Sequence, residues 1–272
     1  MYDGIYLSEL FGPTIQGEGD NCGKLVYFIR LAGCDQKPAC AWCDTMNAYL
    51  KESGEYIKYE DIIQMISNSL NNSYYGITKY VFTGGNPCIQ NLEPLILMIT
   101  NLYQYETDVN FCLETQGTIF PQWVSNYINH LTISPKPPSA DNKNGQSIDS
   151  ILNYCSTVNN MINKGVSFNH TVEIKIVVFN ENDLHYAVDV FNKVSSLDSH
   201  QFSKVNSRNT YKYTIQLGTP LFDDVRKKNN TITGANIINF LYNDSNYKLV
   251  NNQLVFSNLR ILPQIHKVMN LQ

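Results

Sequence analysis

The sequence has no long hydrophobic run and no leader-like start. No stretch approaches the roughly 18 apolar residues of a membrane-spanning helix, and Met1-Tyr2-Asp3-Gly4 lacks the basic region and apolar core of a secretory signal. Net charge is also small. The 20 Lys and Arg against 24 Asp and Glu give a net charge of -4, and the basic residues are scattered. A nucleic-acid surface needs clustered basic residues. We therefore expect a cytoplasmic protein with no nucleic-acid partner and no membrane association.

Cysteine is limited to seven residues, an odd number, which argues against a secreted disulfide framework and for reduced thiols. Three of them, Cys34, Cys40 and Cys43, are clustered at a spacing of C-x5-C-x2-C, and no His or fourth Cys follows Cys43 at a ligand-like interval. Structural zinc sites and closed iron-sulfur clusters normally take four protein ligands. Three thiolates leave one metal position open, as a catalytic site requires. On a 4Fe-4S cluster, that free iron can hold a small chelating molecule.

The 272 residues fit one large α/β domain better than two. Strand-like runs alternate with segments of helical spacing, and Gly12-Pro13 is expected to end the first strand. We expect strands at residues 6–11, 26–32, 79–83, 109–113, 130–134, 171–179, 213–217 and 254–262, and helices at 57–70, 92–102 and 184–194. Repeated strand-helix units with polar motifs at the strand ends predict a parallel sheet curved into a barrel. The polar segments 140–170, which is partly helical, and 195–211 are expected as extended loops, of the kind that form lids, dimer contacts or surface decoration.

Six motifs in order carry a family resemblance. Phe28-Ile29-Arg30-Leu31-Ala32-Gly33-Cys34, followed by Cys40-Ala41-Trp42-Cys43-Asp44-Thr45, resembles the cluster loop of the radical S-adenosylmethionine (SAM) enzymes, and specifically of the 7-carboxy-7-deazaguanine synthase family. The other motifs that resemble this family are Thr14-Ile15-Gln16-Gly17-Glu18-Gly19, Phe82-Thr83-Gly84-Gly85-Asn86-Pro87, Glu114-Thr115-Gln116-Gly117-Thr118, Ser134-Pro135-Lys136-Pro137-Pro138 and Leu262-Pro263-Gln264-Ile265-His266-Lys267. They span nearly the whole length, which makes the match far more specific than three cysteines alone.

The resemblance implies a partial, incomplete TIM-like β/α barrel formed by a single radical SAM domain over residues 1–272, typically as a homodimer. It implies a radical SAM lyase that converts 6-carboxy-5,6,7,8-tetrahydropterin to 7-carboxy-7-deazaguanine with loss of ammonia, in 7-deazaguanine biosynthesis of the queuosine or preQ0 type. The implied cofactors are a 4Fe-4S cluster, SAM as a regenerated cofactor, and Mg²⁺. The implied electron donor is of the flavodoxin type.

The resemblance also implies roles for individual residues around the cluster. Cys34, Cys40 and Cys43 would bind the 4Fe-4S cluster, and the hydroxyl of Thr45 would bind Mg²⁺, a hard cation that prefers oxygen ligands. The usual Glu of the Gly-Gly-Glu-Pro motif is Asn86 here, whose amide oxygen can still accept a hydrogen bond from the SAM ammonium. The residues implied for SAM are Trp42, Cys43, Asp44, Gly85, Asn86, Glu114, Ser134, Pro135, Lys136 and Gln216.

The substrate residues come from both ends of the chain. Arg30 ends a predicted strand, and an Arg fork can bind a carboxylate through two parallel hydrogen bonds. Gln272 takes the place of the terminal Pro with which the family reaches back to the substrate. We assign no catalytic side chain, because a single His such as His266 is more often structural. The residues implied for the substrate are Ile15, Gln16, Gly17, Arg30, Thr83 and Gln272.

Two other functions fit the cysteines. One is a different radical SAM enzyme, an activase of an anaerobic ribonucleotide reductase or of formate-lyase, whose target would be a protein glycyl site. The other is a non-catalytic metal-binding protein with a structural zinc ion, which would be colourless and free of iron and sulfide. The Gln16-Gly17-Glu18-Gly19 loop and Arg30 favour a small pterin over a protein target. The five-residue first cysteine interval, where the superfamily usually has three residues, and Asn86 are the two departures from the superfamily pattern.

Overall fold

The computed structural model describes residues 3–71, 78–103, 109–141, 144–163, 171–201, 211–219, 232–243, 258–265 and 269. A single sheet runs through these residues in the order β3-β1-β2-β4-β5-β6-β7-β8-β9. Its strands are β1 (Gly4–Ile15), β2 (Leu25–Leu31), β3 (Glu55–Lys58), β4 (Lys79–Gly84), β5 (Asn110–Thr115), β6 (His130–Ile133), β7 (Thr171–Val178), β8 (Lys212–Leu217) and β9 (Leu259–Leu262).

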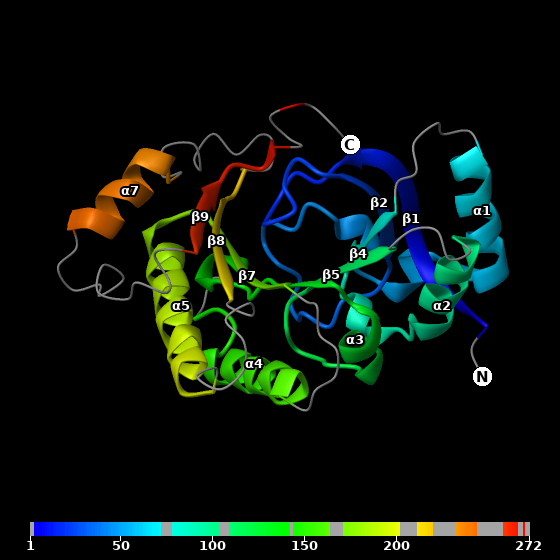
Figure 1. The fold of residues 1–272 in the computed structure, drawn as a ribbon. Helices are drawn as coiled ribbons and strands as arrows, with labels where there is room; N and C mark the ends of the chain where they lie inside the picture. Colours follow the sequence, from blue (N-terminus) through cyan, green and yellow to red (C-terminus); the bar gives the residue numbers. More distant parts are fainter. Residues whose placement is uncertain are drawn as a thin grey trace.

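Neighbouring strands are parallel along the series β2-β4-β5-β6-β7-β8-β9. Strand β1 instead pairs antiparallel with both β2 and β3. In the described part of the chain β3 and β9 form the two edges, so the curved sheet stays an open barrel. The helices lie around its outer side (Figure 1). They are α1 (Tyr59–Asn71), α2 (Glu93–Leu102), α3 (Gln122–Tyr127), α4 (Ile148–Asn163), α5 (Glu181–Gln201) and α7 (Gly234–Asn243), with 3-10 turns η1 (Met46–Ala48), η2 (Lys51–Ser53), η3 (Pro87–Ile89) and η4 (Pro138–Ala140).

The main hydrophobic core fills the space between the sheet and these helices. The side chains of β7 alternate between the two faces of the sheet. Ile174 and Ile176 lie on the outer face and are fully buried in this core. Glu173 and Lys175 point to the opposite, inner face of the curved sheet, where buried polar groups need partners. A second, small apolar cluster of Val26, Phe28, Val81 and Cys112 is separate from the main core. The inside of the barrel is therefore apolar beside β2 and β4 and polar beside β7.

The β/α alternation predicted from the sequence is confirmed, with different limits. The first strand does not end at Gly12-Pro13, because pairing with β2 resumes at Thr14 after an irregularity and continues to Ile15. The short strand β3 and the helices α3 and α7 were not predicted. The segment 140–170 is partly helical as expected, through α4, whereas α5 extends to Gln201 and so occupies the start of the predicted loop 195–211. Among the described residues, no helix is both long and apolar enough to cross a membrane.

Candidate functional site

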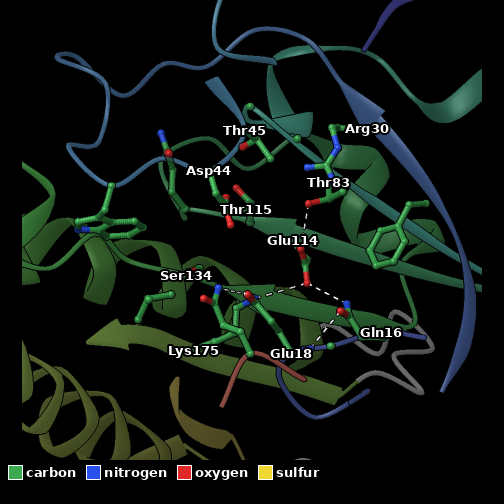
Figure 2. Close-up of a pocket in the computed structure, with 18 of the residues that line it drawn as sticks. Gln16, Glu18, Arg30, Asp44, Thr45, Thr83, Glu114, Thr115, Ser134 and Lys175 are labelled. Atoms are coloured by element: carbon green, nitrogen blue, oxygen red, sulfur yellow. Dashed lines mark hydrogen bonds and ion pairs between the residues drawn. The ribbon is translucent and has the colours of Figure 1, made fainter. Parts of the chain in front are cut away.

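A cavity of about 210 Å³ lies inside the barrel, at the carboxyl ends of the parallel strands (Figure 2). Parallel strands bring the loops that follow them to one edge, which is why ligand sites of α/β barrels form there. Many lining residues lie at or just after the ends of β4, β5, β6 and β7. The cavity is lined by Phe11, Ile15, Gln16, Gly17, Glu18, Phe28, Arg30, Trp42, Asp44, Thr45, Thr83, Gly84, Gly85, Glu114, Thr115, Gln116, Ser134, Lys136, Lys175, Val177, Phe179, Thr219 and Gln264.

The described residues predicted for the substrate all line this cavity: Ile15, Gln16, Gly17, Arg30 and Thr83. The Glu114 carboxylate joins two of them, because Gln16 Nε2 donates to it at 3.1 Å and Thr83 Oγ1 donates to it at 2.9 Å. Glu114 was predicted for SAM, so the sequence had not indicated its contacts with the substrate group.

Arg30 lies on the same wall of the cavity. Its Nε is 3.3 Å from the Glu9 carboxylate, and its guanidinium lies 5.4 Å from the centre of the Phe11 ring. These contacts orient the side chain while it lines the cavity.

A second group of predicted residues, assigned to SAM, lines the cavity through Trp42, Asp44, Gly85, Ser134 and Lys136. The Trp42 indole donates to Ser139 Oγ at 2.9 Å, and its ring centre lies 5.1 Å from that of Phe179. The Lys136 ammonium lies 5.8 Å from the Trp42 ring centre. Thr45, predicted for Mg²⁺, also lines the cavity, with its hydroxyl 3.7 Å from Cys43 Sγ.

Other predicted residues lie outside the cavity lining. Asn86 is fully buried and hydrogen-bonded to Asp35, Thr115 and Thr118. Gln216 is fully buried and donates to the Leu262 carbonyl at 2.9 Å. Pro135 is buried beside Ser134. Their SAM contacts stay predictions, and Gln272 and His266 lie outside the described residues.

Cys34, Cys40 and Cys43 are partly buried on the loop between β2 and η1. The Cys34 amide donates to the Tyr49 carbonyl at 2.9 Å, and the Cys43 amide closes a turn on the Cys40 carbonyl at 3.0 Å. Burial raises the pKa of the Cys34 and Cys40 thiols, while the nearby Lys136 charge lowers it. Metal binding must therefore displace protons.

The donor set of three partly buried thiols on one loop fits an iron-sulfur cluster. No three His, Cys, Asp or Glu side chains of the described residues come close enough to hold one metal ion. A 4Fe-4S cluster differs because each thiolate binds its own iron, so the thiols do not converge on one point. The three thiols therefore fit the cluster implied by the resemblance, in which each binds a separate iron.

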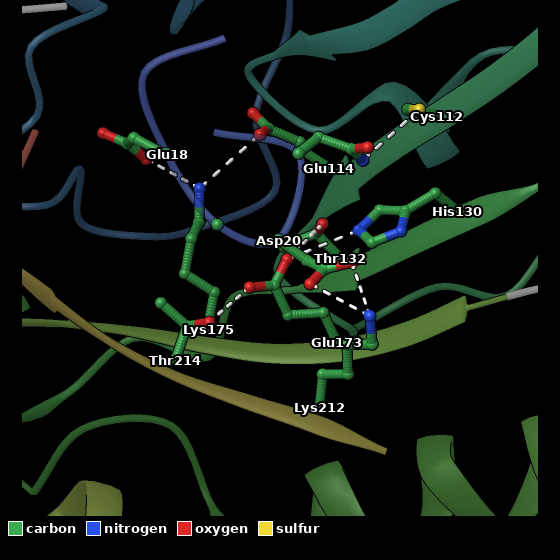
Figure 3. A network of polar contacts seen from close by, with 12 residues as sticks. Glu18, Asp20, Cys112, Glu114, His130, Thr132, Glu173, Lys175, Lys212 and Thr214 are labelled. Atoms are coloured by element: carbon green, nitrogen blue, oxygen red, sulfur yellow. Dashed lines mark hydrogen bonds and ion pairs between the residues drawn. The ribbon is translucent and has the colours of Figure 1, made fainter. Parts of the chain in front are cut away.

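Lys175 is a cavity residue to which the sequence analysis assigned no role. Its side chain is 5% exposed, and its Nζ lies 2.6 Å from a Glu18 carboxylate oxygen and 3.5 Å from a Glu114 carboxylate oxygen (Figure 3). Burial opposes its charge, but the charges of Glu114 and Glu18 outweigh burial and raise the pKa of Lys175. The sequence did contain one signal for this role, because Lys175 lies in the middle of an apolar strand. A charge buried in such a strand needs an oppositely charged partner.

The C-terminal segment reaches the same loop. Gln264 Nε2 donates to Glu18 at 2.6 Å, and the Ile265 amide donates to the Gly17 carbonyl at 3.0 Å. The motif at residues 262–267 therefore contacts the cavity through its described part, although only Gln272 had been predicted there.

Deeper inside the barrel, Glu173 joins three strands (Figure 3). It accepts hydrogen bonds from Thr132 of β6 at 3.1 Å and Thr214 of β8 at 2.5 Å, and His130 Nε2 lies 3.4 Å away. Burial alone would raise the pKa of Glu173, but His130, Thr214 and Lys175 outweigh it and lower the pKa from 4.5 to about 2.

The loop at residues 16–24 crosses the barrel interior above this carboxylate. Gly19 has a φ of +63°, and a Cβ there would lie 2.6 Å from Glu173 Oε2. The next residue, Asp20, pairs with Lys212 at 2.9 Å and Arg260 at 2.8 Å. The loop that presents Gln16 and Glu18 is thus held from β7, β8 and β9.

Comparison with solved structures confirms the fold. The crystal structure of QueE from Escherichia coli aligns over 97% of this chain and 95% of its own, with a TM-score of 0.54 and 21% identity. Native anSMEcpe with bound AdoMet and the Cp18Cys peptide aligns over 84% of this chain and 60% of its own, with a TM-score of 0.51 and 18% identity. The open sheet is thus the partial barrel of the radical SAM enzymes.

Comparison with characterised sequences indicates the family. No protein-family model matches the chain. The 7-carboxy-7-deazaguanine synthase of Bacillus subtilis is 35% identical over 195 residues, which is 70% of this chain and 72% of that protein. The enzyme of the same name from Bacillus cereus is 35% identical over 189 residues, 68% of this chain and 70% of that protein. The chain therefore belongs to the 7-carboxy-7-deazaguanine synthase family.

Proposed function

We propose that this chain is a radical SAM lyase that converts 6-carboxy-5,6,7,8-tetrahydropterin to 7-carboxy-7-deazaguanine with loss of ammonia, for 7-deazaguanine biosynthesis. Family membership supports the reaction. The observation that carries the proposal to this chain is the cavity itself, because residues from five distant motifs line it beside the cysteine loop.

The substrate would lie against the wall formed by Gln16, Arg30, Thr83 and Glu114. Arg30 offers a fork of N–H donors to the pterin carboxylate. Glu114 and Glu18 offer acceptors to the ring N–H groups, and the Lys175 ammonium lies between these two carboxylates. These groups bind and orient the pterin while the cavity limits its contact with water.

The cofactors would lie on the opposite wall. Cys34, Cys40 and Cys43 would hold the cluster, while Trp42, Gly85, Ser134 and Lys136 would hold SAM and Thr45 a magnesium ion. When bound, the reduced cluster and SAM supply a 5′-deoxyadenosyl radical that takes hydrogen from the substrate. Gly85 packs directly against the cysteine loop, where a Cβ would lie 1.9 Å from the Gly33 carbonyl oxygen, so the groups for SAM and for the cluster are adjacent on this wall.

Anaerobic reconstitution with iron and sulfide tests the proposal, followed by incubation with SAM, reductant, magnesium and 6-carboxytetrahydropterin and mass analysis. We expect 7-carboxy-7-deazaguanine without stoichiometric consumption of SAM. Cleavage of SAM with an unchanged pterin would leave a radical SAM enzyme with another substrate, such as a glycyl protein. Failure to assemble a cluster would overturn the assignment of the three cysteines.

The assembly and setting of the protein are further parts of the proposal. We expect a homodimer in the cytoplasm that is reduced by a flavodoxin-type donor. Light scattering coupled to gel filtration would give about twice the 31.0 kDa of the chain if it dimerises. Stopped-flow oxidation of reduced flavodoxin by the reconstituted protein would test the donor.

A further inference from the structure

Asp35, directly after Cys34, is held by side chains from the ends of two strands. Its Oδ1 accepts hydrogen bonds from Asn86 Nδ2 at 2.8 Å and from Gln116 Nε2 at 2.6 Å, and its Oδ2 accepts from Thr118 Oγ1 at 2.5 Å. Asn86 follows β4, whereas Gln116 and Thr118 follow β5. The carboxylate therefore connects the start of the cysteine loop to both strands.

Backbone contacts at the same junction leave little room for adjustment. The Asn86 amide donates to the Gly33 carbonyl at 2.7 Å, and the Gly85 amide donates to the Leu31 carbonyl at 3.1 Å. The Cys34 thiol itself lies 3.8 Å from Gln116 Oε1. The position of Cys34 thus depends on the groups that bind Asp35.

The residue at position 86 is complementary to Asp35. Asn86 is fully buried, and while its Nδ2 donates to Asp35, its Oδ1 accepts from Thr115 Oγ1 at 2.9 Å and from the Cys88 amide at 3.3 Å. A Glu at this position, as many radical SAM enzymes have, would bring a second carboxylate against Asp35. Two carboxylates at such a distance repel each other.

We propose that Asp35 is a positioning residue that holds Cys34 for the cluster, and that Asn86 replaces the usual Glu because it is the partner of Asp35. The inference rests on the proposed function, since it requires that Cys34 binds iron. It assigns Asn86 a role in the cysteine loop that does not depend on a contact with SAM.

The test compares Asp35→Asn, Asn86→Glu and the double variant after anaerobic reconstitution. Iron and sulfide per chain, the rate of iron loss to a ferrous chelator, and the electron paramagnetic resonance spectrum of the reduced cluster are measured. Asn86→Glu should lose iron about tenfold faster or more, which corresponds to about 1.4 kcal/mol. The double variant should return to within about threefold of the parent protein, because the amide introduced at position 35 can donate to the carboxylate introduced at position 86.

Asp35→Asn alone keeps the acceptor for Asn86 and Gln116 and should stay close to the parent protein. The matched control is Asp61→Asn, which makes the same change at an exposed position in the first turn of α1. Iron loss from Asn86→Glu at the parental rate, or no recovery in the double variant, would overturn the inference. The inference would also be overturned if Asn86→Glu fails to fold and the double variant does not restore folding and iron retention. A parent protein that takes up no iron would instead refute the proposed function.

Discussion

At the residue scale, charged groups that face the cavity determine binding, and each has a defined partner. Arg30 is oriented by Glu9 and Phe11, and Lys175 is enclosed between Glu18 and Glu114. Arg30 was predicted from its motif, because the residues that indicate it are neighbours in the chain. Lys175 was not, because its partners lie on β5 and in the loop at residues 16–24, far from it in sequence.

Replacing Arg30 with Ala should weaken binding of the pterin by about 10- to 100-fold, since a hydrogen bond to a charged group contributes about 1.5–3 kcal/mol. Binding of SAM should be unaffected. Calorimetric titration of the reconstituted protein measures both. Lys58→Ala is the control, because Lys58 is an exposed cation that pairs with Asp3 and does not line the cavity. An unchanged pterin affinity in Arg30→Ala would count against its role.

Replacing Lys175 with Met should destabilise the protein by about 3 kcal/mol, the lower end of the cost of breaking a buried ion pair, because two partly buried carboxylates lose their buried counter-ion. Urea unfolding of the apoprotein measures the change. Lys212→Met removes an ammonium that is 33% exposed and leaves Asp20 paired with Arg260, so it should cost about 1 kcal/mol or less. Similar losses in the two variants would show that Lys175 does not neutralise Glu18 and Glu114 in the way the distances indicate.

At the scale of elements, the loop at residues 16–24 brings substrate groups to the cavity and depends on strands at the far side of the sheet. Its motif predicted contacts with the substrate through Gln16 and Gly17, and no role was predicted for Gly19. What Gly19 approaches could not be predicted. Gly19 lies against the carboxylate of Glu173 on β7, which is more than 150 positions later in the chain.

Gly19→Ala should therefore cost more than the ordinary penalty of about 1–2 kcal/mol for a positive φ, because the new methyl group meets the Glu173 carboxylate. Gly23→Ala is the matched control, since Gly23 also has a positive φ, of +87°, and nothing lies within 4 Å of its added Cβ. Thermal unfolding of both apoproteins gives the comparison. Equal shifts in Tm would mean that the loop accommodates the new methyl group beside Glu173 without further destabilisation.

At the scale of the whole molecule, the polar interior joins consecutive strands of an open sheet. Glu173 binds groups on β6 and β8 from its own position on β7. Because its folded pKa of about 2 lies below the unfolded value of 4.5, its ionised form stabilises the fold above pH 4.5. That contribution is lost as the pH falls from 4.5 toward 2.

Glu173→Gln should lower the stability at pH 7 and flatten its dependence on pH between 4.5 and 2. The expected loss in the parent protein over this range is on the order of 3 kcal/mol. Urea unfolding at pH 7 and pH 3 measures about 2 kcal/mol of this loss, because pH 3 covers only part of the range. Glu60→Gln, at an exposed site on α1, should leave the parental pH dependence in place. If the stability of Glu173→Gln falls with pH as much as that of the parent protein, other carboxylates cause the acid sensitivity.

The sequence alone determined the alternation of strands and helices, the cysteine loop and the motifs that follow the strands. These features depend on residue type and on spacing along the chain, which local conformation and ligand chemistry constrain directly. Only the tertiary structure decided that Lys175 neutralises Glu18 and Glu114, that Glu114 joins the substrate wall, and that Asn86 binds Asp35. Curvature of the sheet brings these residues together from separate strands, and contacts across a barrel interior leave no periodic signal in the sequence.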